Sequence, residues 1–266
     1  MILSKIKKIK GYFFPNKNPF NDGPYGSKKE YLNIYNESIQ KEYPHVERFC
    51  NELGFKIDKN YLHQLALITQ VVIKKSEINF QHGNILYSVL RSYIQSVDDD
   101  DLNILETGTA KGFSSICMSK ALLDSGVNGN ILSIDFMPHE KNIYWNCILD
   151  FNGKNSRKSL LEPWTQELKN IQFLEGKTRK ILRNIKLQRI NFAFLDAAHT
   201  KRDVLYEYNY LEPKQQRGDV IIFDDVTEDL FPGVVKAIDS IKSFGKYSVE
   251  LFEISKYRRI AIAKKN

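Results

Sequence analysis

The sequence predicts an α/β protein whose main domain is a doubly wound sheet, preceded by a helical N-terminal segment. From residue 101 onwards, short apolar runs typical of strands alternate with helical stretches, and this alternation indicates crossover units and a parallel sheet. Between residues 30 and 96, apolar residues recur at a spacing of three to four, which is typical of helices. In addition, most of the predicted strands end in a carboxylate, which the stability of a sheet does not require.

The composition is that of an ordinary globular protein. The chain has 266 residues, 42% of them hydrophobic and 27% charged, with a net charge of +7. These values exclude collagen-like, coiled-coil and wholly disordered proteins. No apolar run approaches the roughly 20 residues of a transmembrane helix. Three separated cysteines without a CxxC pair argue against a disulfide scaffold or a zinc site, and predict a cytoplasmic location.

The N-terminus is strongly basic. Residues 1–20 contain five lysines and no acidic residue, and Ile2, Ile6 and Ile9 would share one side of a short helix. A weak contact with a membrane surface or with nucleic acid is one interpretation; a solvated basic terminus is the other. The acidic run Asp98–Asp101 lacks the alternation of a calcium loop and reads as a linker. We therefore place a boundary there, between a helical lid or dimerisation segment (1–100) and the main domain (101–266).

The elements of the main domain follow from local patterns. Predicted strands cover residues 103–107, 130–135, 171–175, 190–196, 220–224, 248–254 and 259–263. Predicted helices cover 112–123, 178–186, 202–211 and 233–243. In open α/β sheets, ligands bind beyond the carboxyl ends of the strands. The acidic residues at those ends are Glu106, Asp135, Glu175, Asp196, Asp224 and Asp225.

The turn after the first strand has the pattern ExGxxxG, from Glu106 through Gly108 to Gly112. Glycines allow the backbone to approach a ligand closely, and Ser114 stands where the next helix begins. Neither the dinucleotide fingerprint GxGxxG nor a phosphate-binding GK[ST] loop fits. A plain strand–helix turn remains an alternative.

Asp135 closes the second strand, 23 positions beyond Gly112. An acid at this place can bind the two hydroxyls of a ribose. A glycine turn without a pyrophosphate cradle, joined to such an acid, suits a nucleoside without phosphates. S-adenosylmethionine is a ligand of this kind, and Glu106 could favour its positive charge.

The segment Ile104–Ser115 resembles the first motif of class I S-adenosylmethionine-dependent methyltransferases. The segments Asn191–His199 and Leu211–Val226 resemble later motifs of their small-molecule O-methyltransferase branch, which includes catechol, caffeoyl-CoA and macrocin-type sugar enzymes. The resemblance covers about residues 101–266 and implies a Rossmann-like seven-stranded sheet with an antiparallel last strand. The predicted strand pair at 248–263 agrees with this.

The resemblance also implies a divalent metal, Mg²⁺ or another cation, bound by Asp196, Asp224 and Asp225. Three converging carboxylates would repel one another without a cation, and Mg²⁺ prefers oxygen ligands. Asp224 and Asp225 could instead cap the next helix or turn. His199 follows Asp196 by three residues, and in the sugar-modifying relatives a histidine at this offset looks like the general base; a purely orienting role is the alternative.

The resemblance further implies cofactor contacts after the second and third strands. The residues expected to bind the cofactor are Glu106, Gly108, Thr109, Gly112, Ser114, Asp135, Met137, Gly176, Thr178 and Asp196. Trp145 and Trp164 either pack in the core or help to bind the acceptor. The Lys- and Arg-rich stretch 141–189 is either solvated or faces an anionic acceptor.

We therefore expect a metal-assisted O-methyltransferase that acts on a hydroxyl of a small molecule, with a sugar or glycosylated compound as the acceptor. A catechol or phenol acceptor is the next alternative. A nucleic-acid methyltransferase is less favoured, because Asp196 begins Asp-Ala-Ala-His rather than a base-methylating motif, and no aromatic stacking stripe is evident. A non-catalytic binding module on the same fold is a third hypothesis, and a homo-oligomer is compatible with the helical segment.

Overall fold

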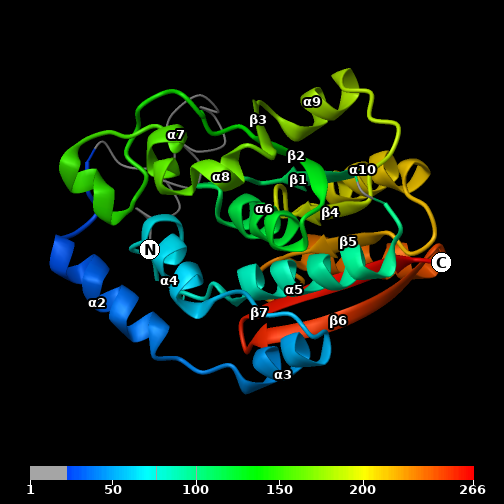
Figure 1. The fold of residues 1–266 in the computed structure, drawn as a ribbon, viewed down its shortest axis with the longest axis horizontal. Coiled ribbons are helices and arrows are strands. Elements are labelled where there is room, and N and C mark those ends of the chain that lie inside the picture. The colour runs from blue at the N-terminus through cyan, green and yellow to red at the C-terminus, as the bar shows by residue number, and fades with distance from the viewer. Residues whose placement is uncertain (1–22, 76, 100) are drawn as a thin grey trace.

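A computed structural model describes residues 23–75, 77–99 and 101–266 (Figure 1). Its centre is a seven-stranded sheet in the order β3-β2-β1-β4-β5-β7-β6. The strands are β1 (Asp101–Thr107), β2 (Asn128–Asp135), β3 (Ile171–Glu175), β4 (Phe192–Leu195), β5 (Val220–Phe223), β6 (Tyr247–Ser255) and β7 (Arg258–Lys265). The basic N-terminal stretch 1–20 lies outside the described residues.

The pairing of the strands confirms the predicted fold class. Strands β1 to β5 pair in parallel, whereas β7 runs antiparallel to both β5 and β6. The strand order reverses beside β1, because β2 and β4 lie on its two sides. In doubly wound sheets this reversal opens a crevice at the carboxyl edge, where ligands bind.

Helices cover both faces of the sheet, so the strands are apolar on both sides. In β4, Phe192 and Phe194 belong to the core under α5 and α6, while Ala193 and Leu195 belong to the core under the opposite helices. The first face carries α4 (Lys59–Thr69), α5 (Gln81–Ser96), α6 (Phe113–Ser125) and α8 (Thr165–Leu168). The second carries α9 (Thr178–Asn184), α10 (Lys201–Leu211) and α11 (Pro232–Ser243).

The N-terminal helices share the core of the main domain. Helices α2 (Lys28–Ile39) and α3 (Pro44–Glu52) lie outside α4 and α5 (Figure 1), and one apolar cluster joins residues of α3 to α5 with residues of the sheet. Helix α5 contacts α6 so closely that Gly83 has no room for a side chain. The domain boundary near residue 100 stays a prediction, but the apolar packing is continuous across it.

The long connection between β2 and β3 contains short elements only. These are η1 (Ile148–Asn152), α7 (Arg157–Leu160), η2 (Glu162–Trp164) and α8, and η3 (Glu212–Lys214) follows α10 later in the chain. Trp145 is fully buried and Trp164 is 6% exposed, so both pack in the core rather than facing solvent. Within the described residues, none of the helices is long and apolar enough to cross a bilayer.

We predict that Gly83→Ala destabilises the protein. An added Cβ would lie 2.5 Å from Phe113 Cε1 and 2.9 Å from Cys117 Sγ, and overpacking of this kind costs about 1–3 kcal/mol. The loss should appear as a lower Tm in thermal unfolding. Gly23→Ala is the control, because nothing lies within 4 Å of its added Cβ. Equal Tm values for the two variants would contradict the tight packing of α5 on α6.

Candidate active site

The carboxyl edge of the sheet brings together the acidic residues that end its central strands. Asp196 follows β4, Asp224 and Asp225 follow β5, and Asp135 ends β2. Parallel strands place their carboxyl ends at one edge, which explains why residues so far apart in the sequence meet there. The site is therefore built on the strand order rather than on one local motif.

The turn after β1 is shaped by its two glycines. Gly108 and Gly112 both have φ near 92°, a conformation that L side chains rarely adopt. A Cβ on Gly108 would lie 2.0 Å from the carbonyl oxygen of Asp196. In addition, the Asp196 amide donates to the Thr107 carbonyl at 2.9 Å. The predicted cofactor turn and the loop after β4 are thus in direct backbone contact.

Glu106 lies beneath this turn and is fully buried. Its carboxylate accepts hydrogen bonds from the hydroxyls of Ser114, Ser115 and Ser133. Burial raises the pKa of Glu106, and the serine hydroxyls oppose this shift. In this structure the carboxylate organises the start of α6, and the Ser133 hydroxyl also lies 2.5 Å from that of Thr109.

Asp135 is 8% exposed at the end of β2. Its carboxylate accepts hydrogen bonds from the amides of Ala110, at 2.6 Å, and Met137, at 2.8 Å. The buried guanidinium of Arg157 lies 3.9 Å away and donates to the carbonyls of Ala110 and Met137. Arg157 was not expected from the sequence, because it lies in an irregular segment that no motif marks.

The remaining predicted cofactor residues lie around Asp135. The Gly176 amide donates to the Asp135 carbonyl at 2.7 Å, and Thr178 is the first residue of α9. Met137 is 5% exposed. The turns after β1, β2 and β3 are therefore adjacent, although the cofactor roles of these residues stay predictions.

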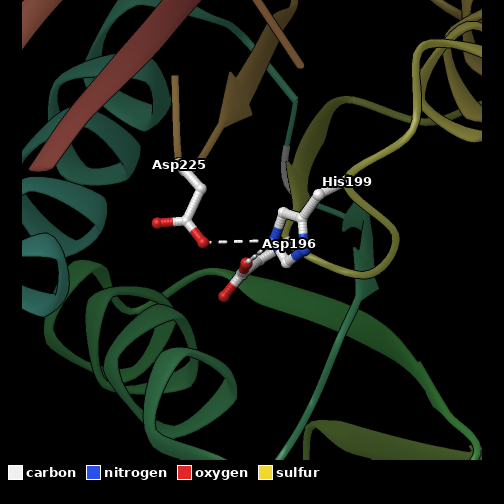
Figure 2. A group of neighbouring side chains, drawn as sticks. All are labelled: Asp196, His199 and Asp225. Atoms are coloured by element: carbon white, nitrogen blue, oxygen red, sulfur yellow. Dashed lines mark ion pairs between the residues drawn. The ribbon is translucent and has the colours of Figure 1, made fainter. Parts of the chain in front are cut away.

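Asp196, His199 and Asp225 converge on one another, as Figure 2 shows. One ligand atom from each residue lies within 4.8 Å of the other two. The His199 Nε2 atom lies 3.1 Å from an Asp225 oxygen and 3.6 Å from an Asp196 oxygen. Nevertheless, this buried nitrogen has no hydrogen-bond partner among the described residues. The His199 ring also packs on Phe231, with centroids 4.1 Å apart.

The charges of this group shift its pKa values. Burial and the neighbouring charge of Asp224 raise the pKa of Asp196 to about 7. Burial opposes protonation of His199, but the adjacent carboxylates of Asp196 and Asp225 outweigh it and raise its pKa to about 10. The two carboxylates therefore favour the protonated form of His199.

Asp224 is oriented differently from Asp225. Its carboxylate is 2% exposed and forms a two-pronged ion pair with Arg258, through Nε at 3.2 Å and through a terminal nitrogen. Arg258, from β7, holds the pKa of Asp224 low against the effect of burial. Asp225, with φ of 56°, points toward His199 instead. The metal role of Asp224 stays a prediction, and sequence reasoning did not find Arg258.

The two carboxylates of Asp196 and Asp225 fit a divalent cation, because they supply the oxygen ligands that Mg²⁺ prefers. The His199 Nε2 atom lies beside them, at 3.1 Å and 3.6 Å, where it could act as a base. The His199 nitrogen is paired with these carboxylates by charge rather than by a well-aligned hydrogen bond, and burial and Asp224 raise the pKa of Asp196. A cation there would remove the repulsion between the carboxylates.

The strand order, the glycine turn after β1 and the acid ending β2 define a class I methyltransferase fold. Residues 105–226 match a family model described as a methyltransferase domain. This match confirms the resemblance to class I S-adenosylmethionine-dependent methyltransferases and the prediction that the chain is a methyltransferase.

Solved structures share this fold. The O-methyltransferase TomG from Streptomyces achromogenes, in complex with S-adenosylmethionine, has 17% identity and a TM-score of 0.56, covering 80% of this chain and 92% of its own. The O-methyltransferase from Bacillus cereus, in complex with S-adenosylhomocysteine, has 18% identity and a TM-score of 0.54, covering 83% and 97%. The O-methyltransferase NovP has 14% identity and a TM-score of 0.55, covering 90% and 100%. No curated protein sequence matches the chain.

We predict that Glu207 makes stability depend on pH. This α10 residue is 2% exposed and accepts a hydrogen bond from Thr107 Oγ1 at 3.2 Å. Burial raises its pKa to about 8 from a usual value of 4.5. Between pH 4.5 and pH 8 the folded state then binds more protons than the unfolded state, so the free energy of unfolding should fall as the pH rises through this range.

The measurement is denaturant unfolding of Glu207→Gln at pH 5 and pH 8.5. The variant should match the wild type at pH 5 and be more stable at pH 8.5 by roughly 1–3 kcal/mol. Glu250→Gln, at an exposed position on β6, is the control and should leave the pH dependence unchanged. A Glu207→Gln variant with the wild-type pH profile would contradict the raised pKa.

Proposed function

We propose that this protein transfers the methyl group of S-adenosylmethionine to a hydroxyl of a small molecule, assisted by a divalent cation. The observation that carries this proposal is the convergence of Asp196, His199 and Asp225 within 4.8 Å beside the turns after β1 and β2. The solved structures that share the fold include O-methyltransferases, which supports oxygen as the accepting atom.

In the proposed reaction, Asp196 and Asp225 would hold the cation, while Asp224 stays paired with Arg258. When bound, such a cation would lower the pKa of a coordinated hydroxyl. His199, which lies beside both carboxylates, is placed to accept the proton of that hydroxyl in its neutral form. The hydroxyl of the acceptor gives its proton to His199, and its oxygen takes the methyl group while S-adenosylhomocysteine leaves.

The turns after β1, β2 and β3 bind the methyl donor in this proposal. Asp135 accepts hydrogen bonds from the ribose hydroxyls, while Gly108 and Gly112 let the backbone approach the amino-acid part. The contact between Gly108 and the Asp196 carbonyl fixes the donor side relative to the acceptor side. Such positioning supplies much of the rate in a bimolecular transfer. The acceptor class we propose is a sugar or a glycosylated compound, as the resemblance to sugar O-methyltransferases implies.

We expect Asp196→Asn and Asp225→Asn to weaken cation binding while cofactor binding persists. Each substitution removes one of two facing carboxylates, so Mn²⁺ affinity measured by calorimetric titration should fall at least about tenfold. Methyl transfer from labelled S-adenosylmethionine to glycoside acceptors should cease in EDTA and return with Mg²⁺. Asp229→Asn, an exposed acid in the same loop, is the control. Full transfer in EDTA would remove the cation from the proposal.

Asp135→Ala should weaken binding of S-adenosylhomocysteine about tenfold or more, because hydrogen bonds to a charged group contribute about 1.5–3 kcal/mol. Calorimetric titration measures this affinity, and the affinity for Mn²⁺ should stay unchanged. Glu140→Ala is the matched control, because Glu140 is exposed and forms a surface ion pair with the exposed Lys158, at 3.7 Å. Equal affinities for S-adenosylhomocysteine in Asp135→Ala and wild type would refute the ribose role of Asp135.

A further inference from the structure

A strongly basic stretch of the chain lies beside the candidate active site. Residues 177–202 contain eight Lys or Arg residues and one acidic residue, Asp196. This stretch therefore has a net charge of +7. The other strongly basic stretch noted above, residues 1–20, lies outside the described residues, so residues 177–202 are considered for their own exposed side chains.

Six of these basic side chains are exposed, and we call them the basic rim. They are Lys177, Lys180, Arg183, Lys186, Lys201 and Arg202. Among the residues that the structure describes, none of the six forms an ion pair, whereas the half-buried Arg179 pairs with Asp203. Surface cations are commonly interspersed with acids, so six exposed cations without acidic partners form a strongly positive surface.

The basic rim is continuous with the site. Helix α9 begins just after β3, and α10 begins two residues after His199. Arg179 joins the two helices, since it donates to Asp203 Oδ1 at 2.7 Å and to the Arg202 carbonyl at 2.9 Å. Both helices therefore start at the carboxyl edge of the sheet, where the reacting hydroxyl would lie.

The rim is too long for a single small anion. Lys177 and Arg183 are six residues apart, which corresponds to about 9 Å along a helix, and Lys186 lies beyond the end of α9. Charges spaced in this way match a ligand that carries several negative charges along its length. A lone phosphate would contact only part of the rim.

The rim also lacks the aromatic side chains that single-stranded nucleic acids use. The large apolar side chains that are exposed in the described residues include Phe136, Leu230 and Tyr257, but none between residues 177 and 202. Stacking of bases on aromatic rings provides much of the binding energy for single strands. The surface therefore suits a polyanion recognised through charge and hydroxyl groups.

We infer that the acceptor is an acidic glycan, whose negative charges lie on the basic rim while one of its hydroxyls enters the site of Asp196, His199 and Asp225. This inference rests on the proposed function, and it specifies the acceptor of the same site. The acidic groups of the glycan do not react; they orient the chain along α9 and raise its local concentration.

The experiment measures fluorescence anisotropy of a labelled oligogalacturonate decasaccharide with the full chain. The test variant is Lys180→Glu/Lys186→Glu, and the control is Lys236→Glu/Lys242→Glu, which makes the same change of charge at exposed positions of α11. We expect the test variant to bind about tenfold more weakly, the control to bind within about twofold of the wild type, and a neutral maltodecaose probe not to bind.

Two further measurements separate the possible results. Lys180→Gln/Lys186→Gln should give an intermediate loss, which guards against misfolding of the charge-reversed variant. An RNA decamer that binds more tightly than the oligogalacturonate would overturn the inference in favour of nucleic acid. Equal loss in test and control variants, or no binding of oligogalacturonate, would also overturn it. Titration with S-adenosylhomocysteine on the same samples tests the proposed function separately, because the basic rim takes no part in that binding.

Discussion

The carboxyl edge of the sheet places three carboxylates close together, and like charges at this separation remain ionised only when cations compensate them. Arg258 compensates Asp224 through a buried, two-pronged ion pair. Protonated His199 compensates the negative charges of Asp196 and Asp225, and these carboxylates raise the pKa of His199 to about 10. The Arg258–Asp224 pair is part of the fold, because removing one partner of a buried ion pair costs about 3–5 kcal/mol. The proton on His199 is exchangeable, since a cation bound by Asp196 and Asp225 could replace it.

The three carboxylates therefore differ in how their charge is compensated, Asp224 by a buried ion pair and the other two by His199. With a divalent cation between Asp196 and Asp225 and a neutral His199, the two positive charges of the cation offset those two carboxylates. Arg258 still offsets Asp224. The site then has no net charge, and the imidazole is free to accept a proton from the acceptor. Lys74 adds a further positive charge that Asp225 and Asp224 attract, so the surrounding chain also contributes to the charge balance of this proposed site.

The sequence predicted the sheet well because its signals are local. Apolar runs ending in acids located β1, β2 and β3 within about two residues, and the number of strands and the antiparallel last strand followed from the resemblance. It also predicted that Asp196 and Asp225 would meet, since parallel strands share one carboxyl edge. Arg258 could not be predicted, because it reaches Asp224 from a hairpin 34 positions later. The sequence also could not predict that the side chains of Asp224 and Asp225 point in different directions, because this depends on the left-handed backbone conformation of Asp225.

The structure also brings the glycine turn after β1 into backbone contact with the loop after β4, which are the donor and acceptor sides in the proposed function. Gly108 touches the carbonyl of Asp196, and the Asp196 amide bonds to Thr107. Any shift of the glycine turn would therefore move the Asp196 carboxylate with it. A methyl transfer needs the oxygen, carbon and sulfur atoms in line, and misplacement by about 1 Å can cost a hundredfold in rate. In the proposed function, contact between backbone atoms would keep the two loops aligned without depending on the conformation of flexible side chains. It leaves recognition of the distant part of the acceptor to surface residues, which can vary without disturbing the reacting atoms.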